Sequence, residues 1–119
     1  MTDNFQLSYS GFNVGVLKFR CEGVVDPGDL VTMYDSSTVR RANENEAFIG
    51  KVLVVDSGLA VVQVAGYTQC EADTELQVGR VKLVSDGYGR VLESDDGIET
   101  WIVTSVMNDD GDNIIGFLL

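Results

Sequence analysis

The sequence predicts an all-β fold: a small barrel or sandwich of about eight to ten short strands, mostly antiparallel, with an extended aromatic N-terminal arm. Turn signals recur about every ten residues, which is the spacing typical of such folds. Thirteen glycines and a single proline in 119 residues also favour many turns between short extended segments. A hydrophobic content of 45% excludes a disordered chain. We expect an arm over residues 1–13 and a single domain over residues 14–119.

The central element of the predicted fold is a β-hairpin within residues 47–70. Two apolar runs, residues 52–55 and 59–65, flank a polar turn in which Gly58 can supply the positive φ of a tight loop. Their many valines favour strands over a helix, because β-branched side chains pack well on a pleated surface. Neither run alternates cleanly between apolar and polar residues. We therefore expect both faces of each strand to be covered, one by a core and the other by further chain or by a partner.

The segment after the arm is expected to form a half-buried strand. Residues 16–22 alternate strictly, with Leu17, Phe19 and Cys21 on the face that we expect to point inward. The other expected strands are residues 30–34, 38–42, 67–70, 80–84, 90–93, 99–107 and 114–119. The last of them is expected to pair within the sheet and to help close the barrel.

The only tryptophan stands in the predicted strand at residues 99–107. Trp101, Val103 and Met107 share one face of this strand. Because that face carries three large apolar side chains, we expect it to point into the core, with Trp101 buried.

An aromatic segment precedes the first predicted strand. Phe5, Leu7, Tyr9 and Phe12 stand among polar and small residues, and they are our candidate partner-binding residues. Such a segment suits an arm that docks on a protein surface. It can dock on its own barrel or on a neighbouring protein, and the sequence leaves both arrangements open.

The charge of the chain is strongly acidic, with 19 acidic and 8 basic residues and a net charge of −11. Such a surface repels phosphate backbones and anionic lipids, and Arg40-Arg41 is the only adjacent basic pair. We therefore expect no nucleic-acid partner. No apolar run approaches the ~18 residues of a membrane span, so we expect a soluble protein with no membrane partner.

The two cysteines, Cys21 and Cys70, lie far apart in extended contexts. The polar start of the chain lacks the pattern of a secretory signal, so we expect synthesis in the cytoplasm, where thiols stay reduced. Two buried thiols are the simplest expectation, and a disulfide between them remains open.

The residue types that usually carry catalysis are scarce. The chain has no histidine, which removes Ser-His and Cys-His arrangements. The pairs Asp95-Asp96 and Asp109-Asp110 each stand beside a glycine in a predicted turn, where carboxylates are solvated and cap the local backbone. We expect no catalytic residues and no enzyme activity.

No metal or cofactor site is expected either. The acidic turn at residues 109–113 supplies oxygens of the kind that Ca²⁺ prefers, but its spacing does not match a helix-loop-helix calcium loop. Two distant cysteines without histidine do not make a tetrahedral zinc site. Lys51 does not stand at a hairpin tip, as the modified lysine of biotin and lipoyl carrier domains does, and no glycine-rich loop precedes a helix to hold phosphate.

Several stretches together carry a family resemblance. They are the aromatic opening at residues 4–12, the central residues 48–52 and 60–67, the turn at residues 83–89 and the closing run at residues 115–119. In this spacing of glycine, valine and aromatic residues, the chain resembles the small capsid decoration proteins, also called structural cement, of tailed bacteriophages and prophages. Residues 68–71 lack the proline and the aromatic residue of that pattern.

The resemblance implies a virion structural protein that binds the head surface of a phage and stabilises neighbouring capsid subunits. It implies the major capsid protein as partner, a location on the capsid surface after synthesis in the host cytoplasm, and a homo-oligomer, with a trimer favoured. Closed symmetry in such an oligomer would bury apolar strand faces.

Two other functions remain open from the sequence. A tail or baseplate β module of a virion would share the same composition and turn spacing. A ligand- or carbohydrate-binding barrel would need a stacking side chain, for which Trp101 is the only strong candidate. Burial of Trp101 in the core would argue against such a barrel.

Overall fold

The structure is a computed structural model of the 119-residue chain, and it describes residues 15–119. It confirms the all-β class, because the described residues contain ten strands and no helix. The strands are β1 (Gly15–Glu22), β2 (Leu30–Asp35), β3 (Thr38–Arg41), β4 (Gly50–Asp56), β5 (Leu59–Ala65), β6 (Tyr67–Ala72), β7 (Gly79–Ser85), β8 (Val91–Glu93), β9 (Ile98–Met107) and β10 (Asn113–Leu118). The arm of residues 1–13 lies outside the described residues, so its extent stays a prediction.

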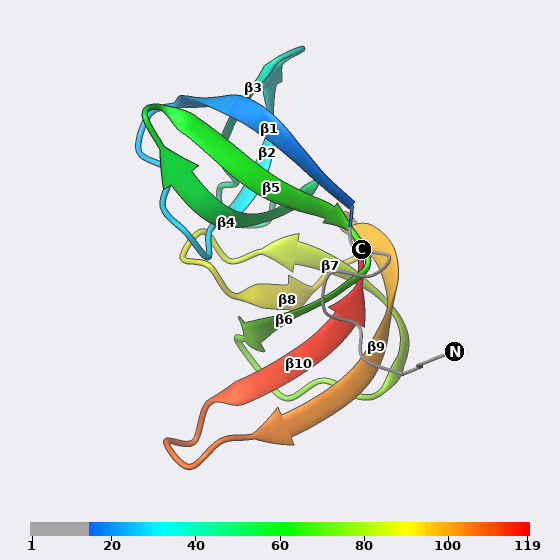
Figure 1. Ribbon diagram of the computed structural model, residues 1–119. Helices are drawn as coiled ribbons and strands as arrows, with labels where there is room; N and C mark the ends of the chain where they lie inside the picture. The colour runs from blue at the N-terminus through cyan, green and yellow to red at the C-terminus, as the bar shows by residue number, and fades with distance from the viewer. Residues whose placement is uncertain (1–14) are drawn as a thin grey trace, which may run out of the picture.

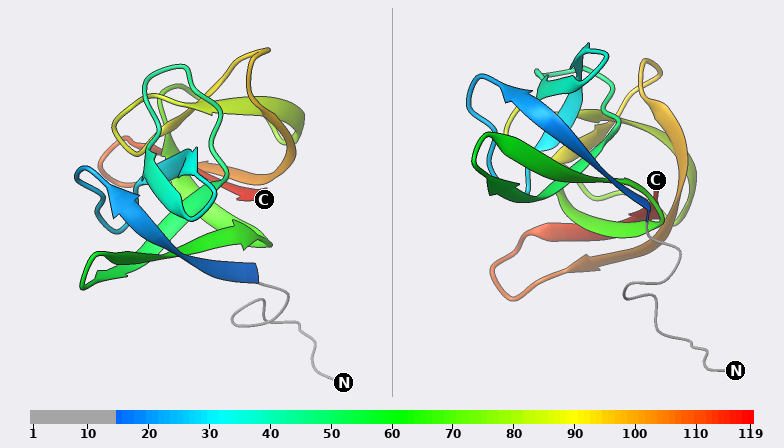
Figure 2. Two further views of the ribbon diagram at one scale, coloured as in Figure 1. Left: turned by 90° about the horizontal axis from the view of Figure 1, so that it is seen from above. Right: turned by 45° about the horizontal axis from the view of Figure 1, so that its top comes forward.

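The ten strands form two small closed barrels of five strands each. Barrel A has the strand order β1-β3-β2-β4-β5, and barrel B has the order β10-β6-β8-β7-β9. The pairings of β1 with β3 and of β6 with β8 are parallel, and the other pairings in the two barrels are antiparallel, as expected. Figure 1 shows barrel A above barrel B, and Figure 2 shows the same pair from two other sides. The last strand, β10, pairs with β6 and β9 and closes barrel B, which confirms its predicted role.

The predicted central hairpin is present as β4 and β5. Ser57 and Gly58 form its two-residue loop, with φ of 53° and 79°, the positive values that match the right-handed twist of paired strands. One face of the hairpin is covered by the interior of barrel A, as expected, and cover of the other face by further chain or a partner stays a prediction. Leu53, Val54 and Leu59 are exposed, because only one face of this hairpin packs on the interior of barrel A.

The chain passes from barrel A to barrel B between β5 and β6. Gly66 makes the link with a φ of 96°, and the Gln63 side chain donates hydrogen bonds to the carbonyl oxygens of Ala65 and Tyr67 on either side of it. The Leu119 amide donates to the Gly66 carbonyl at 2.8 Å. The start of β1 also pairs with Ala65, so the first described residue and the C-terminus both lie at the boundary between the barrels.

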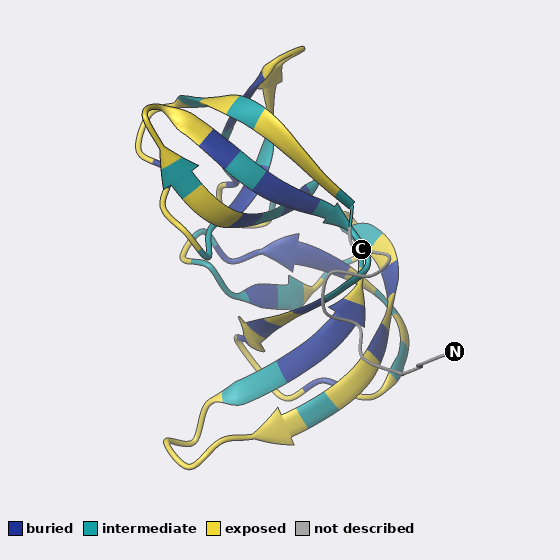
Figure 3. Cartoon of the chain, viewed as in Figure 1, coloured by how far each residue is buried: buried dark blue, intermediate teal, exposed yellow. Residues whose placement is uncertain are grey.

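Each barrel has an apolar interior, and barrel A contributes to both. The interior of barrel A consists mainly of small side chains, the buried residues Val25, Val31, Val39, Val52, Ala60 and Val62. The interior of barrel B also receives Leu30, Ala42 and Phe48, which come from strand β2 and the β3–β4 connection of barrel A. Figure 3 shows buried segments in both barrels, on β5 of barrel A and on β7, β8 and β10 of barrel B.

The largest side chain that crosses the boundary is Phe48. Its ring meets the Phe117 ring of β10 edge to face, with centroids 6.3 Å apart and an interplanar angle of 74°. Both rings are buried to 1% exposure or less. This contact holds the β3–β4 connection, residues 42–49, against barrel B.

Backbone hydrogen bonds fix the same connection to β7. The Asn45 amide donates to the Ser85 carbonyl at 2.8 Å, and the Ser85 amide donates to the Glu46 carbonyl at 2.9 Å. The Glu46 carboxylate in turn holds Arg40 at 2.6 Å and accepts the Asn43 amide at 2.9 Å. The Arg40–Glu46 ion pair and the two backbone hydrogen bonds to Ser85 therefore hold the connection that carries Phe48 in place.

Replacing Phe48 tests whether this ring joins the barrels. We expect Phe48→Ala to lower the free energy of unfolding by about 3–5 kcal/mol, because it leaves a cavity between two interiors. Urea denaturation followed by circular dichroism measures the loss. Tyr88→Ala, at a side chain that is 84% exposed, is the matched control and should change stability by less than about 0.5 kcal/mol. Equal effects of the two substitutions would contradict the joining role.

The Arg40–Glu46 pair predicts a dependence of stability on pH. The hydrogen bond from Arg40 lowers the pKa of Glu46 below its ordinary value of 4.5. A carboxyl with a lowered folded-state pKa stabilises the fold above its unfolded-state pKa, and this contribution is lost as the pH falls through the folded-state value. We expect Glu46→Gln to cost about 1 kcal/mol at pH 7 and progressively less as the pH falls below 4.5. A difference from the wild type that stays constant over this range would contradict the assignment.

Candidate protein interaction surfaces

The described residues contain no assembly typical of a metal site. Within residues 15–119, no three His, Cys, Asp or Glu side chains gather where they could hold a metal ion. The acidic turn between β9 and β10 is organised by Asn108, whose side-chain oxygen accepts the amides of Asp110 and Asp112 at 3.0 and 2.9 Å. These hydrogen bonds are typical of a turn whose backbone amides are capped by a side chain. No helix in this part of the chain could span a membrane.

The two cysteines are free thiols on different barrels. Cys21 lies partly buried in β1, and Cys70 lies buried in β6. Burial raises the pKa of the Cys70 thiol to about 11, although Lys51 opposes this shift. A thiol with that pKa stays protonated at neutral pH, which is unsuited to nucleophilic chemistry.

A depression on the described surface of barrel B has a volume of about 660 Å³. It is wide and polar. Its lining residues are Arg80, Val81, Lys82, Glu93, Ser94, Asp95 and Glu99. An Arg80–Glu99 ion pair of 2.7 Å spans the two strands at its floor, β7 and β9.

The expectation that Trp101 is buried is wrong. Its side chain is 53% exposed, whereas its neighbours Thr100 and Ile102 are buried. The face of β9 that carries Thr100 and Ile102 points inward, and the face that carries Trp101 points outward, which is the opposite of our prediction. Successive side chains of a strand point to opposite faces, so an assignment that is wrong by one residue exchanges the two faces. A bulge at Val103 changes the alternation again toward the end of the strand. Trp101 stands directly opposite Arg80, at the border of the polar depression.

Exposed apolar side chains gather along β9 and the end of β10. We call this set the β9 patch: Trp101, Val103, Val106, Met107 and Leu118, each between 42% and 64% exposed. Tyr67 lies over Gly116 beside it, where any Cβ would collide with the Tyr67 hydroxyl. That hydroxyl is 3.3 Å from the Thr104 hydroxyl and accepts a hydrogen bond from Gln69 at 3.0 Å. The patch therefore combines apolar contact area with a fixed polar centre.

A second exposed surface lies on the outside of barrel A, where β1, β5 and β4 pair side by side. Cross-strand pairing places Lys18, Val61 and Val54 in one row and Arg20, Leu59 and Asp56 in the next. We call these six residues, with Val16 and Lys51 in the preceding row, the cationic face. Lys18, Val54, Asp56, Leu59 and Val61 line a depression of about 180 Å³ in it.

The first half of β1 also has an edge that pairs with no strand of residues 15–119. Residues 15–19 pair with β5 on one side only, whereas β3 joins the other side at Arg20 and continues to Glu22. Unpaired strand edges present backbone donors and acceptors to an incoming strand. Leu17, expected to point inward, is 54% exposed at this edge, so that part of the expectation is wrong, while Phe19 and Cys21 do pack on the interior.

Sequence reasoning and structure agree only in part on the candidate residues. The arm residues Phe5, Leu7, Tyr9 and Phe12 lie outside the described part of the chain, and their role stays a prediction. Lys51 donates a hydrogen bond to the Gln69 carbonyl, which joins β4 to β6 across the barrels. The cationic face and the β9 patch were both missed, although the continuous valine runs were a signal that more apolar residues were present than one interior could bury.

Comparison with known proteins gives no relative for this chain. No protein-family model matches it, and no curated protein matches its sequence.

Proposed function

We propose that this protein is a phage virion structural protein, a capsid decoration or cement protein that binds the head surface and stabilises neighbouring capsid subunits. The observation that carries the proposal is the β9 patch. Its five apolar side chains are exposed in the folded chain, and Trp101, Val106 and Leu118 lie on the outer face of a closed barrel. Several exposed apolar side chains on one pair of strands are typical of a protein–protein contact.

The fold supports a role in adhesion to a protein surface. Trp101 supplies a large amphipathic anchor of the kind that dominates interface energetics, and Tyr67 supplies a second aromatic ring with an oriented hydroxyl. Both lie on strands of one closed barrel, β9 and β6, so little conformational freedom is lost when a partner binds. A rigid patch of this kind suits a clamp between subunits.

The arm would add a second contact to the same partner. The first described strand begins at the boundary of the barrels, opposite Ala65 and near the C-terminus. The described part of the chain therefore begins at the boundary between barrel A and barrel B. Two linked contacts on one shell give an avidity that neither gives alone.

This proposal names the major capsid protein as partner and the capsid surface as location, with a homotrimer as the favoured assembly. It includes no enzyme activity, no cofactor, and no nucleic-acid or membrane partner. The acidic surface fits a protein that faces other proteins and not the packaged DNA.

Binding to empty shells tests the function. Shells of the major capsid protein from the same phage or prophage are mixed with the chain and sedimented. We expect the full chain to co-sediment, and we expect deletion of residues 1–13, or Phe5→Ser with Phe12→Ser, to raise the dissociation constant for shells at least tenfold, which is about 1.4 kcal/mol. The deletion should leave the circular dichroism of the barrels unchanged.

A second variant separates the patch from the arm. Trp101→Ala removes the anchor of the β9 patch and should weaken binding to shells, whereas Tyr88→Ala, at another exposed aromatic ring, should not. Shells that bind neither the full chain nor the variants would refute the decoration role. Density on a tail or baseplate in micrographs of the virion would move the protein to another part of the particle.

The exposure of Trp101 also supports a second candidate function, a carbohydrate-binding barrel. Its ring borders a depression that carries Arg80, Asp95 and Glu99, and aromatic stacking beside charged hydrogen-bonding groups suits sugars.

Tryptophan fluorescence distinguishes this candidate, because the chain has a single tryptophan. We expect acrylamide to quench Trp101 in the folded chain, and we expect a panel of soluble bacterial surface glycans to leave its emission unchanged. A saturable emission shift with one glycan, absent in Glu99→Gln, would favour the carbohydrate-binding function over decoration.

A further inference from the structure

We infer that copies of this chain bind one another head to tail, with the hairpin tip between β9 and β10 of one copy seated on the cationic face of the next. The tip is residues 107–112. The inference goes beyond the proposed function, because it concerns contacts between free copies and needs no shell.

The first observation is the distribution of positive charge. Among residues 15–119, Arg40, Arg41, Arg80 and Arg90 each form an ion pair, and the Lys51 ammonium group donates to a backbone carbonyl. Lys82 of barrel B forms no ion pair with a described residue, but it stands opposite Glu99 in the sheet. Lys18 and Arg20 form no ion pair with any described residue. They stand two residues apart on the same outward side of β1. Two unpaired cations on one strand are unusual in a chain with a net charge of −11.

The second observation is the surface that surrounds these cations. Lys18 borders the depression of about 180 Å³, whose apolar lining comes from Val54, Leu59 and Val61. Two acidic residues, Asp56 and the exposed Glu22 that follows Arg20 on the outward side of β1, stand against three basic ones, Lys18, Arg20 and Lys51. The face therefore has a net positive charge around an apolar depression, which favours a ligand that is both apolar and acidic.

The tip has that chemistry. Asp109, Asp110 and Asp112 form no ion pair within the described part of the chain, and all three are exposed. Met107, 64% exposed, stands directly before them at the end of β9. An unbranched, flexible thioether side chain fills a shallow apolar depression well. The carboxylates beside it would then face Lys18 and Arg20.

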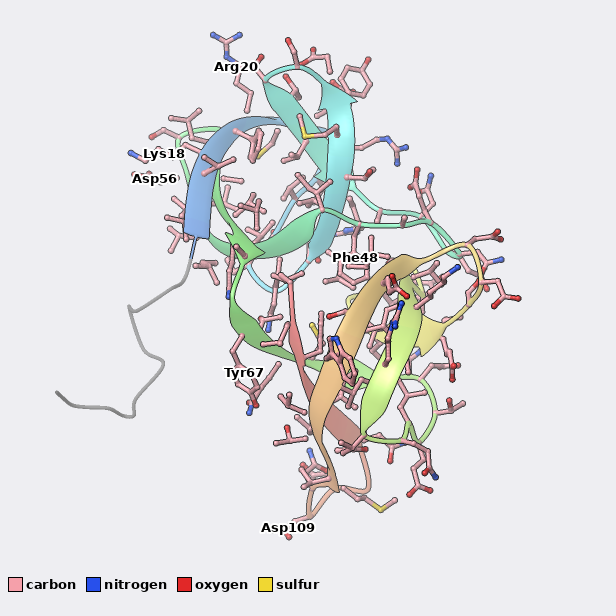
Figure 4. All side chains as sticks on the ribbon, turned by 90° about the vertical axis from the view of Figure 1, so that its right-hand side faces the viewer. Lys18, Arg20, Phe48, Asp56, Tyr67 and Asp109 are labelled. Carbon is pink, nitrogen blue, oxygen red and sulfur yellow. The ribbon has the colours of Figure 1, made fainter. Side chains whose placement is uncertain are left out.

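The two surfaces cannot meet within one molecule. Figure 4 shows Lys18, Arg20 and Asp56 at one end of the molecule and Asp109 at the opposite end. In Figure 1 the hairpin of β9 and β10 also points away from barrel A. A contact between opposite ends of two copies is heterologous. Such contacts close into a ring when the rotation between copies permits it, and otherwise they propagate.

A charge exchange tests the contact in solution, without any shell. One variant carries Lys18→Glu with Arg20→Glu, and the other carries Asp109→Lys with Asp110→Lys. Sedimentation velocity measures association of the wild type, of each variant alone and of their equimolar mixture. We expect the wild type to associate, each variant alone to associate at least tenfold more weakly, and the mixture to regain association, since every contact in it again joins opposite charges.

Matched controls separate this contact from a general effect of net charge. Asp95→Lys with Asp96→Lys changes the net charge as the tip variant does, at another exposed turn. The triple variant with Lys82→Glu, Thr74→Glu and Gln77→Glu makes the same change in net charge as Lys18→Glu with Arg20→Glu, but on barrel B. Both controls should associate like the wild type, and circular dichroism should be unchanged throughout.

Three results overturn the inference. One is a mixture that fails to associate although both variants are folded. Another is a wild-type chain that stays monomeric at its highest attainable concentration. The third is association that appears only after deletion of residues 1–13, which would show that the chain's own arm occupies the cationic face. Because no shell is present, none of these results bears on binding to capsids.

Discussion

The contact between Phe48 and Phe117 is the constraint on which the arrangement of the two barrels depends. Barrel A is closed around buried valine and alanine side chains, with the partly buried Phe19 packed against them. The ring from its β3–β4 connection lies instead in the interior of barrel B, against β10. An edge-to-face aromatic pair contributes stabilisation beyond that of the apolar area it buries. Neither barrel can rotate relative to the other without breaking this contact.

Polar contacts hold the connection that carries Phe48 in one conformation. Glu46 accepts hydrogen bonds from Arg40 and the Asn43 amide, and its own carbonyl accepts the Ser85 amide of β7. Backbone N–H and C=O groups of this loop thereby find hydrogen-bond partners both within the loop and on barrel B. A fixed loop means a fixed angle between the barrels, so the outer surfaces of β1 and β9 keep a constant separation and direction.

The sequence was sufficient for the strands and turns but not for their division into two barrels. Turn residues such as Ser57-Gly58 and the alternation at Phe19 and Cys21 are local signals, and the structure bears them out. Pairing between distant strands has no local signal, and neither did the insertion of Phe48. The direction of Trp101 was missed because β9 carries apolar side chains on both faces and a bulge at Val103, so its pattern does not define an inside.

The acidity of the chain and its exposed apolar surfaces have to be considered together. Apolar patches promote indiscriminate association, and a net charge of −11 opposes it through repulsion between copies. Repulsion is weakest in orientations that bring the few unpaired cations near carboxylates. Lys18 and Arg20 lie beside the apolar residues Leu59 and Val61, so the orientation with the least repulsion is also one that buries apolar area. Charge in this protein therefore selects which apolar contacts form, while the apolar contacts supply the free energy of association.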